Sequence, residues 1–163
     1  MKTLLLMRHA KSSWKEESLQ DSDRPLTRRG EKTAIQIGEY LHEHELRPEL
    51  ALTSSANRTR QTAELVLSTF EDGCQTISTD HLYMAEPDAI LDALHAIPDS
   101  VERVLVVGHN PGMECLAQLL TGEITVLPSA GLSNISLPIT SWKKLADTTS
   151  GELVQLWRPA ESQ

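Results

Sequence analysis

Leu4-Leu5-Leu6-Met7-Arg8-His9-Ala10 is an apolar run that ends abruptly in a cation and an imidazole. Four large apolar side chains in a row are typical of a parallel strand that is buried on both faces. A second run, Val104-Leu105-Val106-Val107-Gly108-His109, ends in the same way. Because ligands of open α/β sheets bind beyond the carboxyl ends of the strands, we expect both histidines at one binding edge.

Strand and helix patterns alternate along the rest of the chain. Further strands are expected at about 50–54, 75–78, 134–137 and 153–157, the last two as edge or antiparallel strands. Helices are expected after Thr27, after Ser54-Ser55, from Pro87-Asp88 and from Pro111. Residues 10–29 lack periodicity and are expected to form a long loop at the end of the first strand. The alternation predicts an α/β fold in one domain spanning residues 1–163.

Several side chains have expected local roles. Thr27 is expected to cap the helix that follows it, and Ser54 and Ser55 are expected to cap the next helix. Pro111 suits the first position of its helix. The two cysteines fall in no metal-binding or redox spacing, so reduced thiols are expected, with Cys115 in the core.

The charge of the chain excludes some partners and points to a confined site. The formal net charge of -8 argues against a nucleic-acid partner. Arginines nevertheless gather in the segments 8–29 and 58–60, which favours a small anion site, with Arg28, Arg29 and Arg60 interpreted as solvated. The apolar residues before Arg8 are too few for a leader or a membrane span, so we expect a cytoplasmic protein that binds no membrane.

Four residues at predicted strand and helix ends could form one pocket: Arg8, His9, Arg58 and His109. Arginine offers a planar fork of donors that suits a phosphoryl group. The helix that begins near Arg58 adds free N–H groups for an anion. A neutral imidazole can act as a nucleophile. The pattern predicts phosphoryl transfer without a metal or another cofactor.

Four segments resemble the histidine phosphatase superfamily and, within it, phosphohistidine phosphatases of the SixA type. The matching segments are Leu6-Met7-Arg8-His9-Ala10-Lys11, Arg24-Pro25-Leu26-Thr27-Arg28-Arg29-Gly30, Ser54-Ser55-Ala56-Asn57-Arg58-Thr59-Arg60-Gln61-Thr62-Ala63 and Val106-Val107-Gly108-His109-Asn110-Pro111-Gly112. The resemblance implies a three-layer α/β/α sandwich with a mostly parallel central sheet. It also implies that His9 becomes phosphorylated, that Arg8 and Arg58 bind the phosphoryl oxygens, and that His109 donates to them. The implied substrate is phosphohistidine in a protein.

The departures from the family pattern concern substrate binding and the proton donor. Ala10 replaces a glycine, and Lys15 stands where mutase-like members carry an asparagine. Lys15 is a candidate phosphate ligand or a solvated side chain, and Ser12 is a candidate lining residue. The ester-cleaving branches carry a glutamate or aspartate between the motif of Arg58 and the motif of His109, and Glu86 lies nearest to the expected position. The interpretation that we favour is that Glu86 caps or precedes a helix together with Asp88.

Two alternatives to the leading hypothesis remain open at this point. One is a phosphatase for small phosphate esters that uses Glu86 as its acid. The other is a phosphate-binding module without turnover, which would keep the pocket but perform no chemistry. The sequence fixes neither the phosphorylated partner nor the oligomeric state.

Overall fold

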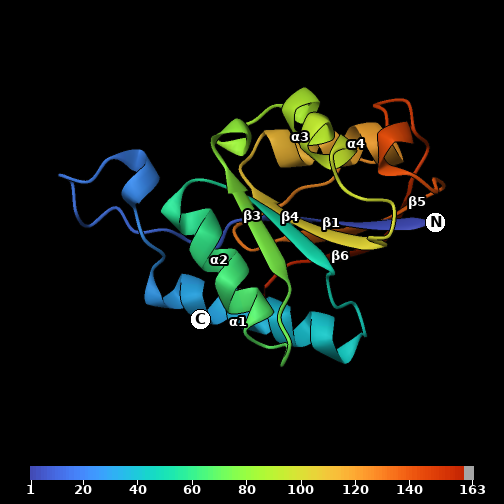
Figure 1. Cartoon of the computed structure of the whole chain (residues 1–163). Helices are drawn as coiled ribbons and strands as arrows, with labels where there is room; N and C mark the ends of the chain where they lie inside the picture. Colours follow the sequence, from blue (N-terminus) through green and yellow to red (C-terminus); the bar gives the residue numbers. More distant parts are fainter. Residues whose placement is uncertain (160–163) are drawn as a thin grey trace.

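A single mixed sheet lies at the centre of the computed structural model, which describes residues 1–159 (Figure 1). Its strands are β1 (Lys2–Arg8), β2 (Leu50–Ser54), β3 (Gln75–Thr79), β4 (Arg103–Gly108), β5 (Leu132–Leu137) and β6 (Glu152–Trp157). Their order across the sheet is β3-β2-β4-β1-β5-β6. Neighbouring strands from β3 to β1 are parallel, whereas β5 runs antiparallel to both β1 and β6. The sheet is therefore mostly parallel, as predicted.

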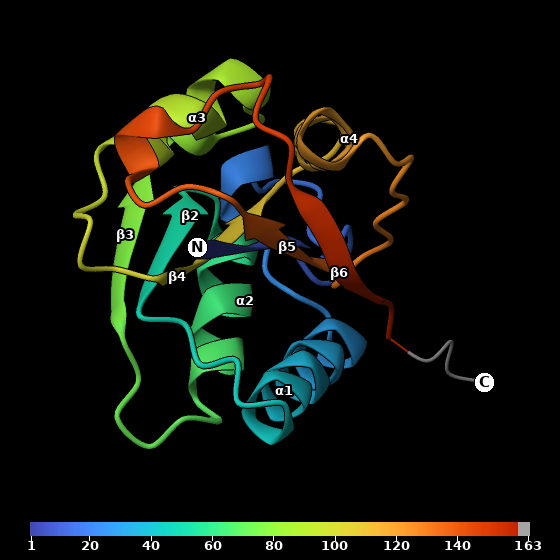
Figure 2. The same cartoon turned by 90° about the vertical axis from the view of Figure 1, so that its right-hand side faces the viewer.

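Helices cover both faces of this sheet. The helices are α1 (Arg28–Glu43), α2 (Asn57–Leu67), α3 (Pro87–His95) and α4 (Gly112–Thr121), with short 3-10 turns η1 (Asp21–Asp23), η2 (Asp80–Leu82) and η3 (Trp142–Lys144). Figures 1 and 2 show α1 and α2 on one face and α3 and α4 on the other. The predicted three-layer α/β/α sandwich is confirmed. Within residues 1–159, no helix is long and apolar enough to cross a membrane.

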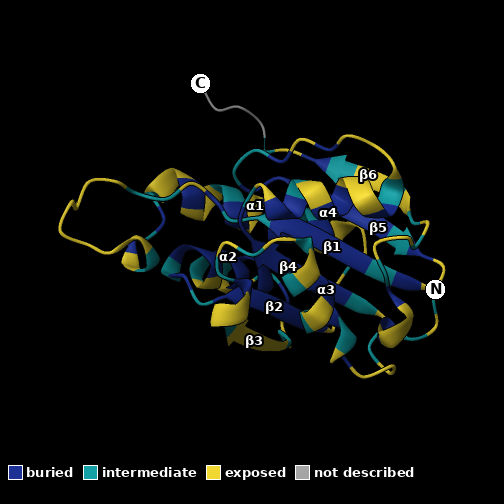
Figure 3. Cartoon of the chain, turned by 90° about the horizontal axis from the view of Figure 1, so that it is seen from above, coloured by how far each residue is buried: buried dark blue, intermediate teal, exposed yellow. Residues whose placement is uncertain are grey.

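The strand β1 is central because its side chains fill both hydrophobic cores. Leu4 and Leu6 pack in the core with α3 and α4, whereas Leu5 and Met7 pack in the core with α1 and α2. All four side chains are fully buried, and Figure 3 shows the buried centre of the sheet in dark blue. Burial of each such side chain is worth about 1.5–3 kcal/mol. This burial explains why the run shows no alternation of apolar and polar residues.

Helix ends agree with the sequence at some positions and differ at others. Thr27 caps α1 as expected, since its hydroxyl accepts the N–H of Gly30 at 2.9 Å. The prediction that Ser54 and Ser55 cap α2 is wrong, because Ala56 is the N-cap and no side chain caps this helix. Pro111 is the N-cap of α4 rather than its first residue.

The two free cysteines are placed differently from one another. Cys74 is half-buried, but Cys115 is exposed, which corrects its predicted core position. The buried face of α4 carries Met113, Leu116 and Leu120. Because successive residues of a helix turn by about 100°, Cys115 falls on the other side of the helix.

The register between β1 and β4 sets the position of the candidate site. Arg8 pairs with Gly108, so His9 and His109 leave the sheet at neighbouring positions. The backbone N–H of His9 still donates to the Gly108 carbonyl at 3.1 Å. The loop that follows His9 projects beyond this edge of the sheet, on the left in Figure 1.

Candidate active site

A cavity of about 450 Å³ lies at the carboxyl ends of β1 and β4. The structure brings five predicted residues to its wall: Arg8, His9, Ser12, Arg58 and His109. The ring centroids of the two histidines are 5.5 Å apart, with one ring edge directed at the other. The cavity wall also includes residues for which no catalytic role was predicted: Lys11, Trp14, Asp21, Arg24 and Met84.

One ring nitrogen of His9, Nε2, has no hydrogen-bond partner among the described residues. Its Nδ1 lies 2.7 Å from the carbonyl oxygen of Ala10. Because a carbonyl only accepts, Nδ1 carries the proton in the neutral ring and Nε2 does not. Burial, together with the charges of Arg58, Arg8 and Arg24, lowers the pKa of His9 to about 4, against the opposing effect of the Ala10 hydrogen bond. At neutral pH the ring is therefore uncharged, a state in which an imidazole nitrogen can act as a nucleophile.

His109 is more deeply buried and both of its nitrogens have partners. Its Nε2 lies 2.7 Å from the Ser54 hydroxyl, and its Nδ1 lies 3.4 Å from a terminal nitrogen of Arg58. Arginine only donates, so Nδ1 accepts in this state and Nε2 donates to Ser54. Burial first, and then the charge of Arg58, lowers the pKa of His109 to about 3. His109 is a neutral, oriented ring at the wall of the cavity.

The Ser54 hydroxyl links His109 to the start of α2. Its oxygen accepts the N–H of Ala56 at 3.2 Å and lies 2.8 Å from the Thr59 hydroxyl. Thr59 in turn donates to a backbone carbonyl of the same turn. Sequence reasoning missed this role because it assigned Ser54 to a helix cap. The position at the end of β2, next to β4, is what brings the hydroxyl to His109.

Arg58 is held in place by Asp21, which comes from the loop after His9. One terminal nitrogen of Arg58 donates to the Asp21 carbonyl at 2.8 Å and the other donates to its carboxylate at 3.0 Å. The buried Nε atoms of Arg8 and Arg58 have no hydrogen-bond partner within residues 1–159. Both guanidinium groups also line the cavity, where their N–H groups can donate to an anion.

Asp21 is ionised because donors surround its carboxylate. A hydrogen bond from the Tyr83 hydroxyl, followed by the bond and charge of Arg58 and the charge of Arg24, lowers the pKa of Asp21 to about 2 despite partial desolvation. Asp21 therefore places a negative group on the arginine fork, as a bound phosphoryl group would. The 10–29 segment has no periodicity that could have identified this residue.

Arg24 is a third arginine of the cavity and is itself buried. It donates to the Ser12 hydroxyl at 2.9 Å and to the Asp21 carboxylate at 3.2 Å. The ring of Trp14 covers it, with the guanidinium carbon 3.4 Å from the ring centroid, a cation–π arrangement. Ser12 thus lines the cavity and also orients Arg24.

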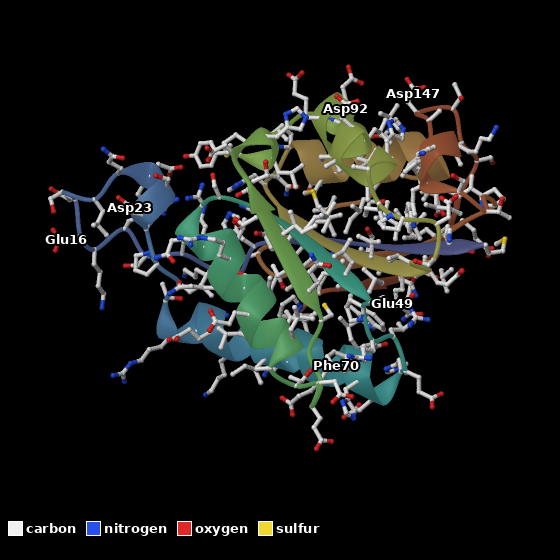
Figure 4. All side chains as sticks on the ribbon, in the orientation of Figure 1. Glu16, Asp23, Glu49, Phe70, Asp92 and Asp147 are labelled. Carbon is white, nitrogen blue, oxygen red and sulfur yellow. The ribbon has the colours of Figure 1, made fainter. Side chains whose placement is uncertain are left out.

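The structure does not bring Lys15 and Glu86 to the cavity. Lys15 is exposed and precedes Glu16, which Figure 4 labels on the projecting loop. Glu86 is exposed too and is the N-cap residue of α3, without a capping bond from its side chain. Within residues 1–159, no group of three or more histidine, cysteine, aspartate or glutamate side chains is arranged to hold a metal ion.

Comparisons with known proteins agree with this arrangement. Residues 4–82 match the model of the histidine phosphatase superfamily (branch 1). An uncharacterized protein of Mycobacterium leprae is 32% identical over 94% of this chain and 99% of its own length.

Two solved structures extend the likeness over nearly the whole chain. A candidate phosphohistidine phosphatase SixA of Agrobacterium tumefaciens has a TM-score of 0.82 and 28% identity, over 97% of this chain and 98% of its own. A second candidate SixA, from Nakamurella multipartitia, has a TM-score of 0.83 and 29% identity, over 98% and 96%. The chain belongs to the histidine phosphatase superfamily, whose members are phosphatases or mutases.

Proposed function

We propose that this protein is a phosphohistidine phosphatase that acts on a phosphorylated protein through a covalent phosphohistidine at His9. The observation that carries the proposal is the acid–base state of the cavity. Asp21 is the one carboxylate among the described residues that line the cavity, and it is held ionised with a pKa of about 2. Both histidines there are neutral, so these three groups include no acid ready to protonate a leaving group.

The leaving group distinguishes the two classes of substrate. An alkyl phosphate ester leaves as an alkoxide and needs a proton donor in the transition state. Phosphohistidine leaves as a neutral imidazole when the far nitrogen of its own ring already carries a proton. The cavity therefore favours the phosphoramidate, and the exposed position of Glu86 gives the ester alternative no support.

In the first step, the Nε2 lone pair of His9 forms a bond to phosphorus. The bond between phosphorus and the substrate nitrogen breaks, and its electron pair stays on the departing imidazole. The guanidinium groups of Arg8 and Arg58 lie on the cavity wall, where they can stabilise the negative charge on the transferring oxygens. His109 can serve as a further donor once a proton moves to its Nδ1 and the Ser54 hydroxyl donates to its Nε2.

In the second step, water attacks the phosphorus of phosphorylated His9. The bond between phosphorus and Nε2 breaks, its electron pair returns to the ring, and inorganic phosphate leaves with the oxygen of the water. The departing group is again a neutral imidazole, because Nδ1 of His9 keeps its proton throughout, and the protons of the attacking water stay on the phosphate or pass to solvent. The same chemistry thus serves both steps without a strong acid.

A protein substrate is supported by the open mouth of the cavity. Trp14 and Met84 on its wall are 73% and 50% exposed. A rim that stands in solvent leaves room for a phosphorylated side chain still attached to its own chain. The two solved structures named SixA share this fold over nearly their whole length.

The test is a phosphate-release assay on three substrates: a phosphohistidine protein, a phosphohistidine peptide and an alkyl phosphate. We expect rapid release from the phosphohistidine substrates, slow release from the ester, and no release by the His9→Ala variant. The Glu86→Gln variant is the matched control and should retain the wild-type rates. Fast ester turnover that Glu86→Gln abolishes would contradict the proposal. Binding of phosphate without any release would contradict it as well.

A further inference from the structure

A second cavity, of about 530 Å³, adjoins the first. Lys11 and Ser129 line both cavities, so the two share a wall. None of the residues that hold His9 or His109 in place belongs to the second cavity. The second cavity therefore adjoins the proposed site of phosphoryl transfer without including its histidines.

Segments that are distant in sequence build this second cavity. Arg29 lies in the first turn of α1, and Arg158 and Pro159 follow β6. Figure 2 shows the end of β6 beside the start of α1. Pro128, from the loop before β5, completes this part of the wall. Pro128 and Pro159 restrict the backbone dihedral angles on this side, which favours a cavity that keeps its shape.

The charge of the second cavity is opposite to that of the whole chain. The formal net charge of the protein is -8, yet the described residues on this wall include cations and no carboxylate. Lys11 is exposed at the shared wall. The Nε of Arg158 donates to the Val126 carbonyl at 3.2 Å, which holds the guanidinium near the opening. A concave cationic surface in an acidic protein raises the local concentration of anionic groups.

We propose that the second cavity docks an acidic segment of the phosphorylated protein, next to its phosphohistidine. This inference rests on the proposed phosphohistidine phosphatase activity. Aspartate or glutamate side chains near the phosphohistidine would face Lys11 and Arg158 while the phosphoryl group enters the first cavity. Charge complementarity of this kind raises association rates and selects partners more than it adds affinity.

The experiment compares two phosphohistidine peptides of equal length, one with aspartate and glutamate beside the phosphohistidine and one with asparagine and glutamine. We expect the wild-type protein to turn over the acidic peptide with a kcat/KM about three- to tenfold higher, as exposed ion pairs give. The difference should shrink at high salt, because exposed charges are screened. The Arg158→Glu variant should lose the preference.

The matched control is Arg60→Glu, which makes the same change of charge at an exposed arginine that lines neither cavity. It should keep the preference for the acidic peptide. A small phosphoramidate without flanking residues reports whether the chemical site of each variant is intact.

The outcomes separate this inference from the proposed function. Equal turnover of both peptides by the wild-type protein would overturn the docking surface and leave the phosphatase activity standing. Loss of the preference in Arg60→Glu as well would also overturn it, since net charge rather than this cavity would then set the preference. Absence of release from both peptides and from the phosphoramidate would overturn the proposed function itself.

Discussion

His9 and His109 follow neighbouring parallel strands at paired positions, and burial lowers the pKa of both. Their hydrogen bonds nevertheless differ. Nδ1 of His9 is held by the adjacent Ala10 carbonyl, whereas its Nε2 has no hydrogen-bond partner within residues 1–159. His109 has both nitrogens engaged, by Ser54 and Arg58. The two histidines thus occupy equivalent positions in the sheet but differ in what their rings can do. A ring with one unpartnered nitrogen can attack phosphorus, whereas a ring with both nitrogens hydrogen-bonded is suited to hold or donate to the phosphoryl group.

The largest effect is expected from His9→Ala, which removes the free nitrogen. Phosphate release from a phosphohistidine protein should fall by at least about four orders of magnitude, as for loss of other nucleophiles. Circular dichroism should show an unchanged fold. Residual turnover within a hundredfold of wild type would mean that another group attacks phosphorus.

A smaller effect is expected from His109→Ala, because in the proposed mechanism this ring donates to the transferring phosphoryl group and does not attack phosphorus. Its loss should lower kcat by about two to three orders of magnitude, as for one donor to a transition-state oxygen. Rapid quenching should still detect the phosphoenzyme. If the folded His109→Ala variant formed no phosphoenzyme, His109 would be as necessary as His9 for phosphoryl transfer, and the proposed difference in their roles would be contradicted.

The loss of the Ser54 hydroxyl, which contacts His109, should lower activity less than the loss of His109 itself. Ser54→Ala should lower kcat by about tenfold and stability by about 1–2 kcal/mol, since one hydrogen bond to the ring and one to Ala56 are lost. Thr53→Val is a matched control, because the buried Thr53 hydroxyl on the same strand has no partner within residues 1–159. Equal kinetics of the two variants would deny Ser54 a positioning role.

Asp21→Asn should strengthen anion binding at the arginine fork. The substitution removes the carboxylate charge of Asp21 that is paired with Arg58. The Kd for phosphate should therefore fall by about two- to fivefold, the size of effect expected from a partly exposed ion pair. Titration calorimetry measures this change. Asp23→Asn, an exposed neighbour in η1 that does not line the cavity, should leave the Kd unchanged. Weaker binding by Asp21→Asn would show that the carboxylate organises the site rather than competing for it.

The pH dependence of His9 gives the mildest test. With a pKa near 4, the ring stays neutral well below the ordinary value of 6.5. Its resonances in a histidine NMR titration should therefore move around pH 4. The lowered pKa of His9 also makes the free energy of unfolding depend on pH. The stability is full above about pH 6.5 and decreases as the pH falls to about 4, because in this range the His9 ring binds a proton more tightly in the unfolded chain than in the folded one. A titration midpoint near pH 6.5 would contradict this prediction, because the cavity would then leave the pKa of His9 at its ordinary value.

The fold and three of the four pocket residues, Arg8, His9 and His109, could be predicted because these residues end continuous apolar runs, whereas Arg58 was found in the first turn of the helix that follows β2. Leu4–Met7 and residues 104–107 mark their strands without reference to anything distant in sequence. Asp21 could not be predicted, because a loop without periodicity does not reveal which side chain folds back onto Arg58. The role of Ser54 depends on the adjacency of β2 and β4, a matter of strand order rather than of local pattern.

The proposed covalent intermediate can be tested by locating the phosphoryl group on the enzyme. The protein would be mixed with a phosphohistidine protein labelled on its phosphoryl group, quenched in alkali within milliseconds, and digested for mass spectrometry of the peptides. We expect a phosphoryl group on the peptide that contains His9 and none on the peptide that contains His109. Label on His109, or release of phosphate with no labelled intermediate at any quench time, would contradict this expectation.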